Sequence, residues 1–162
     1  MEICAICAES DFQKCVQVIR ESFHTISEQF GLTKENCPSH PAFMEIQDLK
    51  NIIQRGATVF GAFDKDELVG VVVTEEVKPG LFSMEKLAVL PGYRHMGVGA
   101  SLVKAVVDYA QRNNAKQIDI GIIDENSVLK EWYCSQGFIE TEKRQFAHLP
   151  FTVCFMQAHL EL

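Results

Sequence analysis

The sequence lacks several features that assign a chain to a broad class. It has no run of basic residues and a formal net charge of −7, so it offers no basic face to neutralise a nucleic acid. No apolar stretch approaches the roughly 20 residues that cross a membrane. The first residues, Met-Glu-Ile-Cys, carry no positive charge of the kind that begins a signal peptide. We therefore expect a cytoplasmic protein whose partners include no nucleic acid and no membrane.

Cysteine occurs six times but in no metal-binding pattern. Only Cys4 and Cys7 stand close together, and no second pair or histidine partner completes a zinc site. Both belong to an apolar run typical of a strand, where residues three apart point to opposite faces. We expect reduced, buried thiols that act as small hydrophobic side chains, and no metal.

What is present is typical of a globular protein, with 47% apolar and 23% charged residues. No repeat, low-complexity segment or linker divides the chain, so we expect a single domain over residues 1–162. Hydrophobic periodicity and turn residues predict the elements in this order: strand 2–8, a helix from a Ser10-Asp11 cap to about 30, a helix from 46 to Gly56, hairpin strands 58–63 and 68–74, strand 81–90, a helix ending near 113–114, strand 116–123, helix 124–136, and strands 138–147 and 152–160.

This order predicts an α/β fold with a mixed sheet of about seven strands flanked by about four helices. The strands before and after the central helix need a crossover connection and must run parallel, whereas the hairpins are antiparallel.

The most informative stretch is a glycine-rich turn between the central strand and the central helix. Pro91 and Gly92 end the strand. Gly97 and Gly99 carry no Cβ, so they leave the first amides of the helix open to a ligand. Those amides and the positive end of the helix dipole favour phosphate, and Arg94 adds a forked cation. We predict an anion-binding turn, for a pyrophosphate.

Three kinds of phosphate site use a glycine-rich turn of this type. A P-loop needs a Lys-Ser/Thr pair after its second glycine, which is missing here. A dinucleotide site needs a third glycine where Leu102 stands, and Asp119, at the distance of a ribose contact, lies inside a strand. The third pattern, Arg-x-x-Gly-x-Gly-Ala after a Leu-Ala-Val strand, resembles the coenzyme A-binding motif of the GNAT superfamily of N-acetyltransferases.

A second motif follows one strand later. Asn126, Tyr133, Gly137 and Phe138 match the pattern Asn-x6-Tyr-x3-Gly-Phe of the same superfamily, with Trp132 where the family usually has leucine. Alone, this stretch is an ordinary helix with Asn126 or the next serine as N-cap. Together the two motifs indicate a GNAT-like fold with a splayed parallel pair of strands at the cofactor site.

The resemblance implies transfer of an acetyl group from acetyl-coenzyme A to a primary amine of a small molecule or peptide, by direct attack. It implies that strand residues pair with the pantetheine amides, that one of their amides stabilises the oxyanion, and that the turn binds the pyrophosphate. The implied cofactor-binding residues are Leu87, Ala88, Val89, Arg94, His95, Met96, Gly97, Val98, Gly99, Ala100 and Asn126.

Tyr133 matches the position of the family's proton donor to the departing thiolate. A phenol with a pKa of about 10 can protonate a thiolate whose pKa is about 8.5, especially a desolvated one. The alternative is a tyrosine that only fills the helix–sheet interface.

Glu85 is the candidate base that takes the proton from the acceptor ammonium. Strand alternation places its side chain on the same face as those of Leu87 and Val89. The alternative is a solvated carboxylate paired with a nearby lysine. Glu75 and Glu76, at the end of the preceding strand, are the fallback candidates.

The acceptor site is the part that the sequence defines least. The resemblance places it between the loop joining the first two helices and the C-terminal hairpin. Packing within the loops also explains each candidate, and the acidic chain suits a cationic amine such as a polyamine, an aminoglycoside or an N-terminal amine. Whether two copies form a homodimer is left open. The candidates are His24, Phe30, Asn36, His40, Phe43, Phe146, His148 and Phe151.

Two other function classes stay open. One is a non-catalytic GNAT-fold module that binds coenzyme A as a sensor or scaffold, and the other is a protein-interaction domain with an accidental glycine turn. Release of thiol with a panel of amines tests for the enzyme, and a thermal shift with acetyl-coenzyme A tests for cofactor binding.

Overall fold

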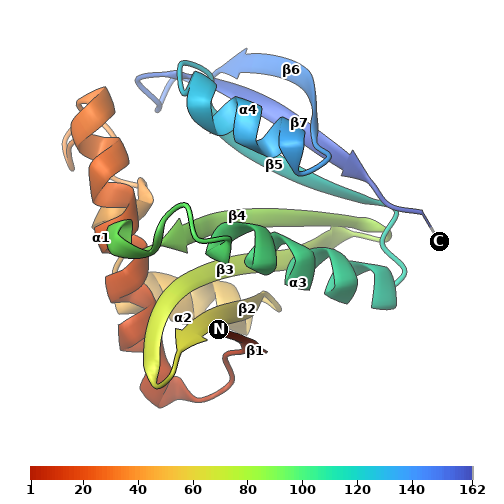
Figure 1. Ribbon diagram of the computed structural model, residues 1–162. Coiled ribbons are helices and arrows are strands. Elements are labelled where there is room, and N and C mark those ends of the chain that lie inside the picture. The colour runs from red at the N-terminus through yellow and green to blue at the C-terminus, as the bar shows by residue number, and fades with distance from the viewer. Residues whose placement is uncertain (162) are drawn as a thin grey trace.

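The computed structural model describes residues 1–161, whose strands form a seven-stranded mixed sheet in the order β1-β2-β3-β4-β5-β7-β6 (Figure 1). The predicted fold class and order of elements are confirmed. The bounds are β1 (Glu2–Ala5), α1 (Phe12–Phe30), α2 (Ile46–Gln54), β2 (Thr58–Asp64), β3 (Glu67–Lys78), β4 (Leu81–Val89), α3 (Val98–Arg112), β5 (Gln117–Ile123), α4 (Ser127–Ser135), β6 (Ile139–Gln145) and β7 (Thr152–His159), with short 3-10 turns at Glu9–Asp11, Pro41–Phe43 and Pro91–Tyr93.

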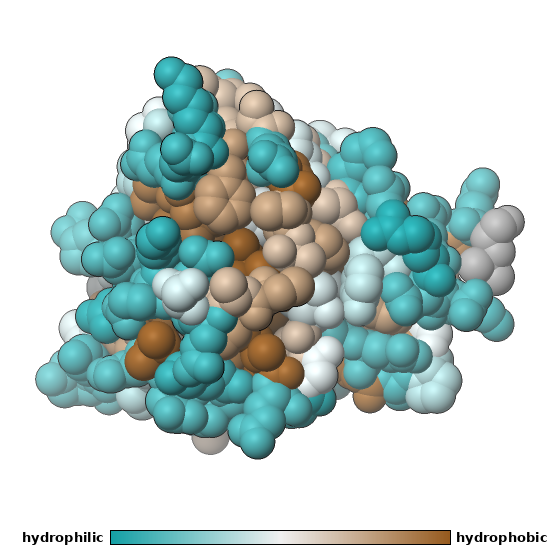
Figure 2. All heavy atoms as spheres, turned by 90° about the horizontal axis from the view of Figure 1, so that it is seen from below, coloured by the Kyte–Doolittle hydropathy of each residue, from teal (hydrophilic) through white to brown (hydrophobic). Residues whose placement is uncertain are grey.

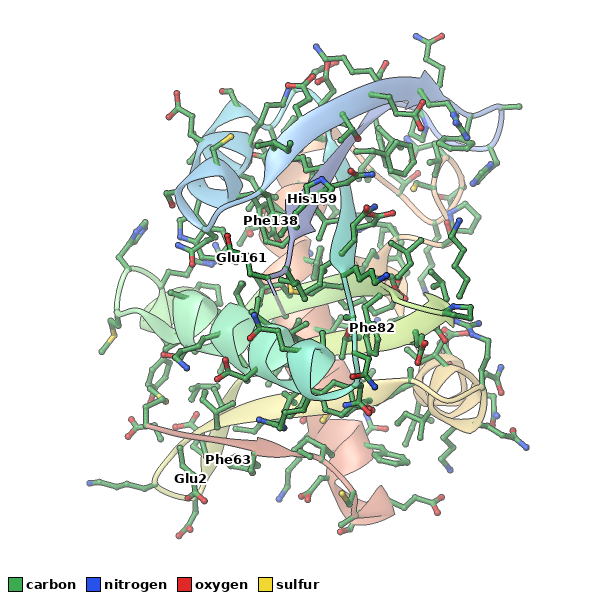
Figure 3. The ribbon with its side chains drawn as sticks, turned by 90° about the vertical axis from the view of Figure 1, so that its right-hand side faces the viewer. Glu2, Phe63, Phe82, Phe138, His159 and Glu161 are labelled. Carbon is green, nitrogen blue, oxygen red and sulfur yellow. The ribbon has the colours of Figure 1, made fainter. Side chains whose placement is uncertain are left out.

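The helices cover the two faces of the sheet, and each face has its own apolar cluster. The cluster under α3 and α4 contains Leu102 and Ile118, and the cluster under α1 and α2 contains Ile19 and Leu49. Phe82 of β4 and Phe138, which follows α4, both belong to the first cluster and are labelled in Figure 3. The sheet is thus the middle layer of three.

Two local predictions at the N-terminus were wrong. The first strand ends at Ala5 and not at residue 8, so Cys7 lies beyond it and is exposed. The Asp11 side chain does not cap α1, because a 3-10 turn runs directly into the helix. Within this turn the Asp11 amide donates to the Ala8 carbonyl and the Phe12 amide to the Glu9 carbonyl, which supplies the bonds a cap would make.

Both edges of the sheet limit further strand pairing. β1 is four residues long, and β6 is exposed and rich in charged residues along its whole length. Short length and charge are the usual protections of an edge strand.

Seen from below the view of Figure 1, the protein has apolar side chains gathered in the middle of its surface and hydrophilic ones around them (Figure 2). Within the described chain, none of the helices has the length and apolar character needed to cross a membrane.

The central parallel pair separates along its length, as predicted. β4 and β5 pair only at Leu81–Gln117, Phe82–Ile118 and Ser83–Asp119. β4 then continues to Val89 and β5 to Ile123 without pairing, and the two strands diverge (Figure 1). Beyond Ser83 the edge of β4 that faces β5 is therefore open.

β4 also contains a bulge within this open stretch. Between the pairs made by Glu85 and Ala88, two residues, Lys86 and Leu87, oppose the single residue Val72. Lys86 has a φ of +55°, in the left-handed region that non-glycine residues seldom adopt. Such a bulge reverses the alternation of side chains along the rest of the strand.

The bulge corrects the prediction that Glu85 shares a face with the residues after it. Met84 packs in the cluster under α3 and α4, and Leu87 and Val89 pack against the same cluster. Ala88 belongs to the cluster under α1 and α2. Because Glu85 adjoins Met84 in regular strand, it points to the α1–α2 face, opposite to Leu87 and Val89.

Candidate active site

The turn between β4 and α3 leaves the first amides of α3 uncovered. Gly97 precedes the helix with a φ of +82°, and no side chain caps the helix start. The amides of Val98, Gly99 and Ala100 consequently have no carbonyl one turn earlier to bond. A Cβ built on Gly97 would meet nothing within 4 Å. This glycine turn (residues 94–100) fits an anion such as a diphosphate.

The cation of the glycine turn is anchored to α1. Arg94 Nη2 donates to the Ser22 carbonyl at 2.9 Å and to Thr25 Oγ1 at 3.1 Å, and Ser22 Oγ is 3.4 Å away. All these partners are neutral, so they leave the guanidinium charge uncompensated. Burial lowers the pKa of Arg94 from its ordinary value, but guanidinium stays charged in proteins. Arg94 therefore brings a positive charge to the turn.

A second anchor ties the turn to the β2–β3 hairpin. The Tyr93 hydroxyl lies 3.2 Å from Asp64 Oδ2 and 3.2 Å from Glu67 Oε2. Partial desolvation and these two carboxylates raise the pKa of Tyr93. The two anchors fix the segment before α3 from both sides. Neither was predicted from the sequence, because each joins residues far apart in the chain.

The open edge of β4 presents main-chain groups next to this turn. The Leu90 amide donates to the Val69 carbonyl of β3 at 2.9 Å. Alternation therefore turns the main chain of Val89, and that of Leu87, away from β3. The Val89 amide is not free as predicted, since it donates to Ser22 Oγ at 3.2 Å. The Leu87 amide and the carbonyls of both residues remain on the open side.

Other predicted cofactor residues are distributed around these two surfaces. His95 has a φ of +64°, and both His95 and Met96 are exposed. Ala88 pairs with Val71 of β3 and is completely buried on the opposite face. A direct contact of Ala88 with a ligand in the gap is therefore not supported.

α4 closes the other side of the gap with an aromatic side chain. The Trp132 atoms Cζ2 and Cη2 lie 3.3 and 3.4 Å from where a Cβ on Gly99 would stand, and Val89 Cγ2 lies 3.9 Å away. A side chain at Gly99 would push the indole aside. This glycine therefore allows α3 and α4 to approach, in addition to the predicted opening of the helix start.

Tyr133 lies beneath this contact, with its ring centroid 5.0 Å from that of Trp132 and 5.5 Å from that of Phe138. The residue is only 6% exposed, and burial raises the pKa of its hydroxyl above the ordinary value. The hydroxyl is consequently protonated over the whole neutral range. It can donate a proton only to a strong base, such as a desolvated thiolate.

Asn126 is the N-cap of α4, one of the two predicted alternatives. Its Oδ1 accepts from the Leu129 amide at 3.2 Å, and the residue is 7% exposed. One lone pair of the oxygen is thus used within the helix, and the amide nitrogen is left to make the predicted contact with the cofactor.

The carboxylates considered as bases lie in different surroundings. Glu85 is half-buried, with Lys86 Nζ 3.4 Å from its Oε2. Glu75 receives two hydrogen bonds from Arg55, at 2.8 and 3.2 Å. Glu76 accepts from a turn amide. Of these three carboxylates, Glu85 alone has as its hydrogen-bond partner the lysine next to it in the sequence.

The structure brings together the two loops predicted to surround the acceptor. Leu32 and Cys37 of the α1–α2 loop are buried against Ile123 at the end of β5, and Phe30 and Phe151 pack onto them. Next to this cluster lies a cavity of about 350 Å³, whose lining includes His24, Glu28, Lys34, Glu35 and Phe43.

Two of the predicted acceptor residues have other surroundings. His40 is 7% exposed, its Nδ1 accepts from the Ala42 amide at 3.3 Å, and burial lowers its pKa to about 4. His40 therefore supports the loop from inside. Phe146 packs against Phe155, with the Arg144 guanidinium 5.8 Å from its ring centroid, so its contacts lie within the β6–β7 hairpin.

One further group of metal-ligating residue types lies outside this site. Side-chain ligand atoms of Asp124, Glu140 and Cys154 lie within 4.8 Å of one another. Lys130 Nζ is 2.6 Å and Lys143 Nζ 3.3 Å from Asp124 Oδ1. Two ammonium groups at this position make it an ion-pair network at the start of α4.

Comparison with known proteins gives a family match over most of the chain. The acetyltransferase (GNAT) family profile matches residues 20–138, which include the glycine turn, the open edge of β4 and Tyr133. Solved structures with a similar fold include the PaiA N-acetyltransferase from Thermoplasma acidophilum in complex with coenzyme A, with 18% identity, coverage of 99% of this chain and 100% of that one, and a TM-score of 0.81.

Two further solved structures share the fold. The ribosomal-protein-alanine N-acetyltransferase from Brucella melitensis has 18% identity, a TM-score of 0.75, and coverage of 99% of this chain and 100% of that one. A spermidine N-acetyltransferase chimera from Vibrio cholerae and hSSAT has 15% identity, a TM-score of 0.72, and coverage of 98% of this chain and 94% of that one.

Proposed function

Because the chain belongs to the acetyltransferase (GNAT) family, we propose that it transfers an acetyl group from acetyl-coenzyme A to a primary amine of a small molecule or peptide. One observation carries the proposal: the open edge of β4 beyond Ser83 lies next to the uncapped start of α3. Each offers unpaired main-chain groups, and together they match an extended amide-containing arm that ends in a diphosphate.

The residues of the two surfaces divide the binding of the co-substrate between them. The amides that begin α3 and the Arg94 guanidinium would hold the diphosphate. The Leu87 amide and the carbonyls of Leu87 and Val89 would pair with the amides of the arm, as an added strand does. Bound here, acetyl-coenzyme A supplies an acyl group activated as a thioester.

Proton transfers are assigned to opposite faces of the sheet. Glu85 points to the α1–α2 face and would take the proton of the acceptor ammonium, directly or through water. Tyr133 lies under α4 on the other face and would donate to the departing thiolate. Burial raises the pKa of both a phenol and a thiol, so the transfer needs the thiolate to be desolvated as well.

The acceptor would enter between the α1–α2 loop and the β6–β7 loop. The cavity on the α1–α2 side of this entrance is lined by α1 and the loop after it, and carries two carboxylates, Glu28 and Glu35, against one lysine, Lys34. His24 Nε2 lies 2.9 Å from Glu28 Oε1. An excess of negative charge favours a cationic amine. Two of the neighbouring structures are named for amine acceptors, a ribosomal-protein alanine and spermidine.

The test is release of coenzyme A thiol from acetyl-coenzyme A in the presence of polyamines, aminoglycosides and peptides with free N-termini. Turnover with one class establishes the activity and names the acceptor. A thermal shift with acetyl-coenzyme A but no thiol release with any amine would instead identify a binding module. Absence of both would refute the proposal.

A further inference from the structure

Ser22 of α1 contacts both surfaces of the proposed cofactor site. Its Oγ accepts from the Val89 amide at 3.2 Å, on the open edge of β4. Its carbonyl accepts from Arg94 Nη2 at 2.9 Å, at the glycine turn. The residue is 7% exposed, so these bonds form away from bulk water. A single helical residue thus joins the strand that would bind the arm to the cation that would bind the diphosphate.

The hydrogen bond from Val89 to Ser22 takes the place of the sheet pairing that β5 does not make at this part of β4. β5 pairs with β4 only as far as Ser83, which leaves the Val89 amide without a sheet partner. A buried amide without a partner is costly, and the Ser22 hydroxyl supplies the missing acceptor. It also fixes the orientation of the peptide that joins Ala88 to Val89 on the open edge of β4.

Thr25, one turn later, completes the contact with the turn. Its Oγ1 donates to the Ser22 carbonyl at 2.9 Å and lies 3.1 Å from Arg94 Nη2. The guanidinium nitrogen is therefore held by oxygens of both residues, and none of them is charged. Arg94 is oriented by α1 without losing its charge to a carboxylate.

We propose that Ser22 and Thr25 are positioning residues for coenzyme A: Ser22 sets the edge of β4 for the arm, and Thr25 sets Arg94 for the diphosphate. The inference rests on the proposed function, because it assigns roles within the same site. Preorganised binding groups improve affinity because less order must be imposed when the ligand binds.

A second buried serine of α1 provides a matched control. Ser27 is 5% exposed, and its Oγ donates to the His24 carbonyl within the same helix at 2.9 Å. Ser27→Ala removes a buried hydroxyl from the same helix without touching β4 or Arg94. A general effect of losing a buried hydroxyl would appear in both serine variants.

The experiment measures the dissociation constants of coenzyme A and of ADP, which has the diphosphate but no arm. Ser22→Ala should weaken coenzyme A by roughly three- to tenfold, as for one lost hydrogen bond, and ADP by less than about twofold. Thr25→Val, which keeps the side-chain shape, should weaken both ligands by the same factor. Ser27→Ala should change neither.

Several results would overturn the inference. Unchanged coenzyme A affinity in Ser22→Ala, or equal losses for both ligands, removes the role at Val89. Tighter binding would mean that the hydroxyl competes with the arm for that amide. If Ser22→Ala does not fold, unchanged ADP affinity in Thr25→Val is enough to refute the proposal that the two residues position the coenzyme A site. If the wild type binds neither ligand, the proposed function fails first; if it binds both and the variants match Ser27→Ala, only this inference fails.

Discussion

At the scale of the residue, Tyr133 shows how the same burial serves two purposes. Its ring fills the space between Trp132 and Phe138, and its raised pKa keeps the hydroxyl protonated. Tyr133→Phe retains the ring packing and removes the hydroxyl group that would donate the proton. We expect turnover to fall by about 10²- to 10⁴-fold while the affinity for coenzyme A changes little. Steady-state kinetics with a titration of coenzyme A measure both quantities, and wild-type turnover in this variant would exclude the acid role.

His40 makes stability depend on pH through a single buried ring. The pKa of His40 in the folded protein, about 4, lies below the ordinary value of 6.5. As the pH falls, His40 is therefore protonated at a higher pH in the unfolded chain than in the folded protein. Stability from this residue is therefore complete above about pH 6.5 and is lost progressively down to about pH 4. His40→Asn keeps an acceptor for the Ala42 amide but does not titrate in this range. Urea unfolding between these pH values should show a steeper pH dependence for the wild type than for His40→Asn, and parallel curves would contradict the assignment.

At the scale of the element, α3 and α4 come close to each other at Gly99 and Trp132. Gly99→Ala places a Cβ 3.3 Å from Trp132 Cζ2, so the indole must move toward the gap or away from it. We expect weaker binding of coenzyme A in Gly99→Ala and restoration by the second change Trp132→Leu. A double-mutant cycle on the dissociation constants measures the coupling. Strictly additive effects would show that the two residues do not interact in binding.

The glycine before α3 behaves differently, because its constraint is conformational. A Cβ on Gly97 meets no atom within 4 Å, but φ is +82°. Gly97→Ala should therefore destabilise the fold by about 1 kcal/mol through the backbone, with no dependence on Trp132. Chemical denaturation of the single variant and of its combination with Trp132→Leu tests this, and rescue by the tryptophan change would contradict it.

The two amides predicted to serve the cofactor arm should now differ in hydrogen exchange. The Val89 amide already donates to Ser22, whereas the Leu87 amide faces the gap. Coenzyme A should therefore slow exchange at Leu87 and at the first amides of α3 much more than at Val89. Exchange followed by NMR with and without coenzyme A measures this, and equal protection of both strand amides would mean that Val89 changes partner on binding.

At the scale of the whole molecule, the sequence predicted what local patterns carry and missed what distant contacts decide. The order of elements follows from periodicity and crossover rules, the N-cap of α4 from the choice between Asn126 and Ser127, and the parting of β4 from β5 from the resemblance to the GNAT superfamily. The anchor of Arg94 does not, because Ser22 lies 72 positions earlier and no local pattern reports that contact. The burial of His40 agrees with the alternative of packing within the loop, but the sequence did not show which rings surround it, since these come from α1 as well as from the loop itself.

The bulge at Lys86 divides β4 into two half-strands that are out of phase with each other. Phe82 and Met84 before it and Leu87 and Val89 after it all serve one side, although their numbers change from even to odd. Deleting Lys86 would restore a continuous period of two and leave Leu87 and Val89 on the α3 side and Ala88 on the α1 side. If Lys86 were instead drawn into regular strand, the small methyl of Ala88 would stand toward α3 and the isopropyl of Val89 toward α1. The bulged conformation of one residue therefore determines which side chains each side of this strand presents.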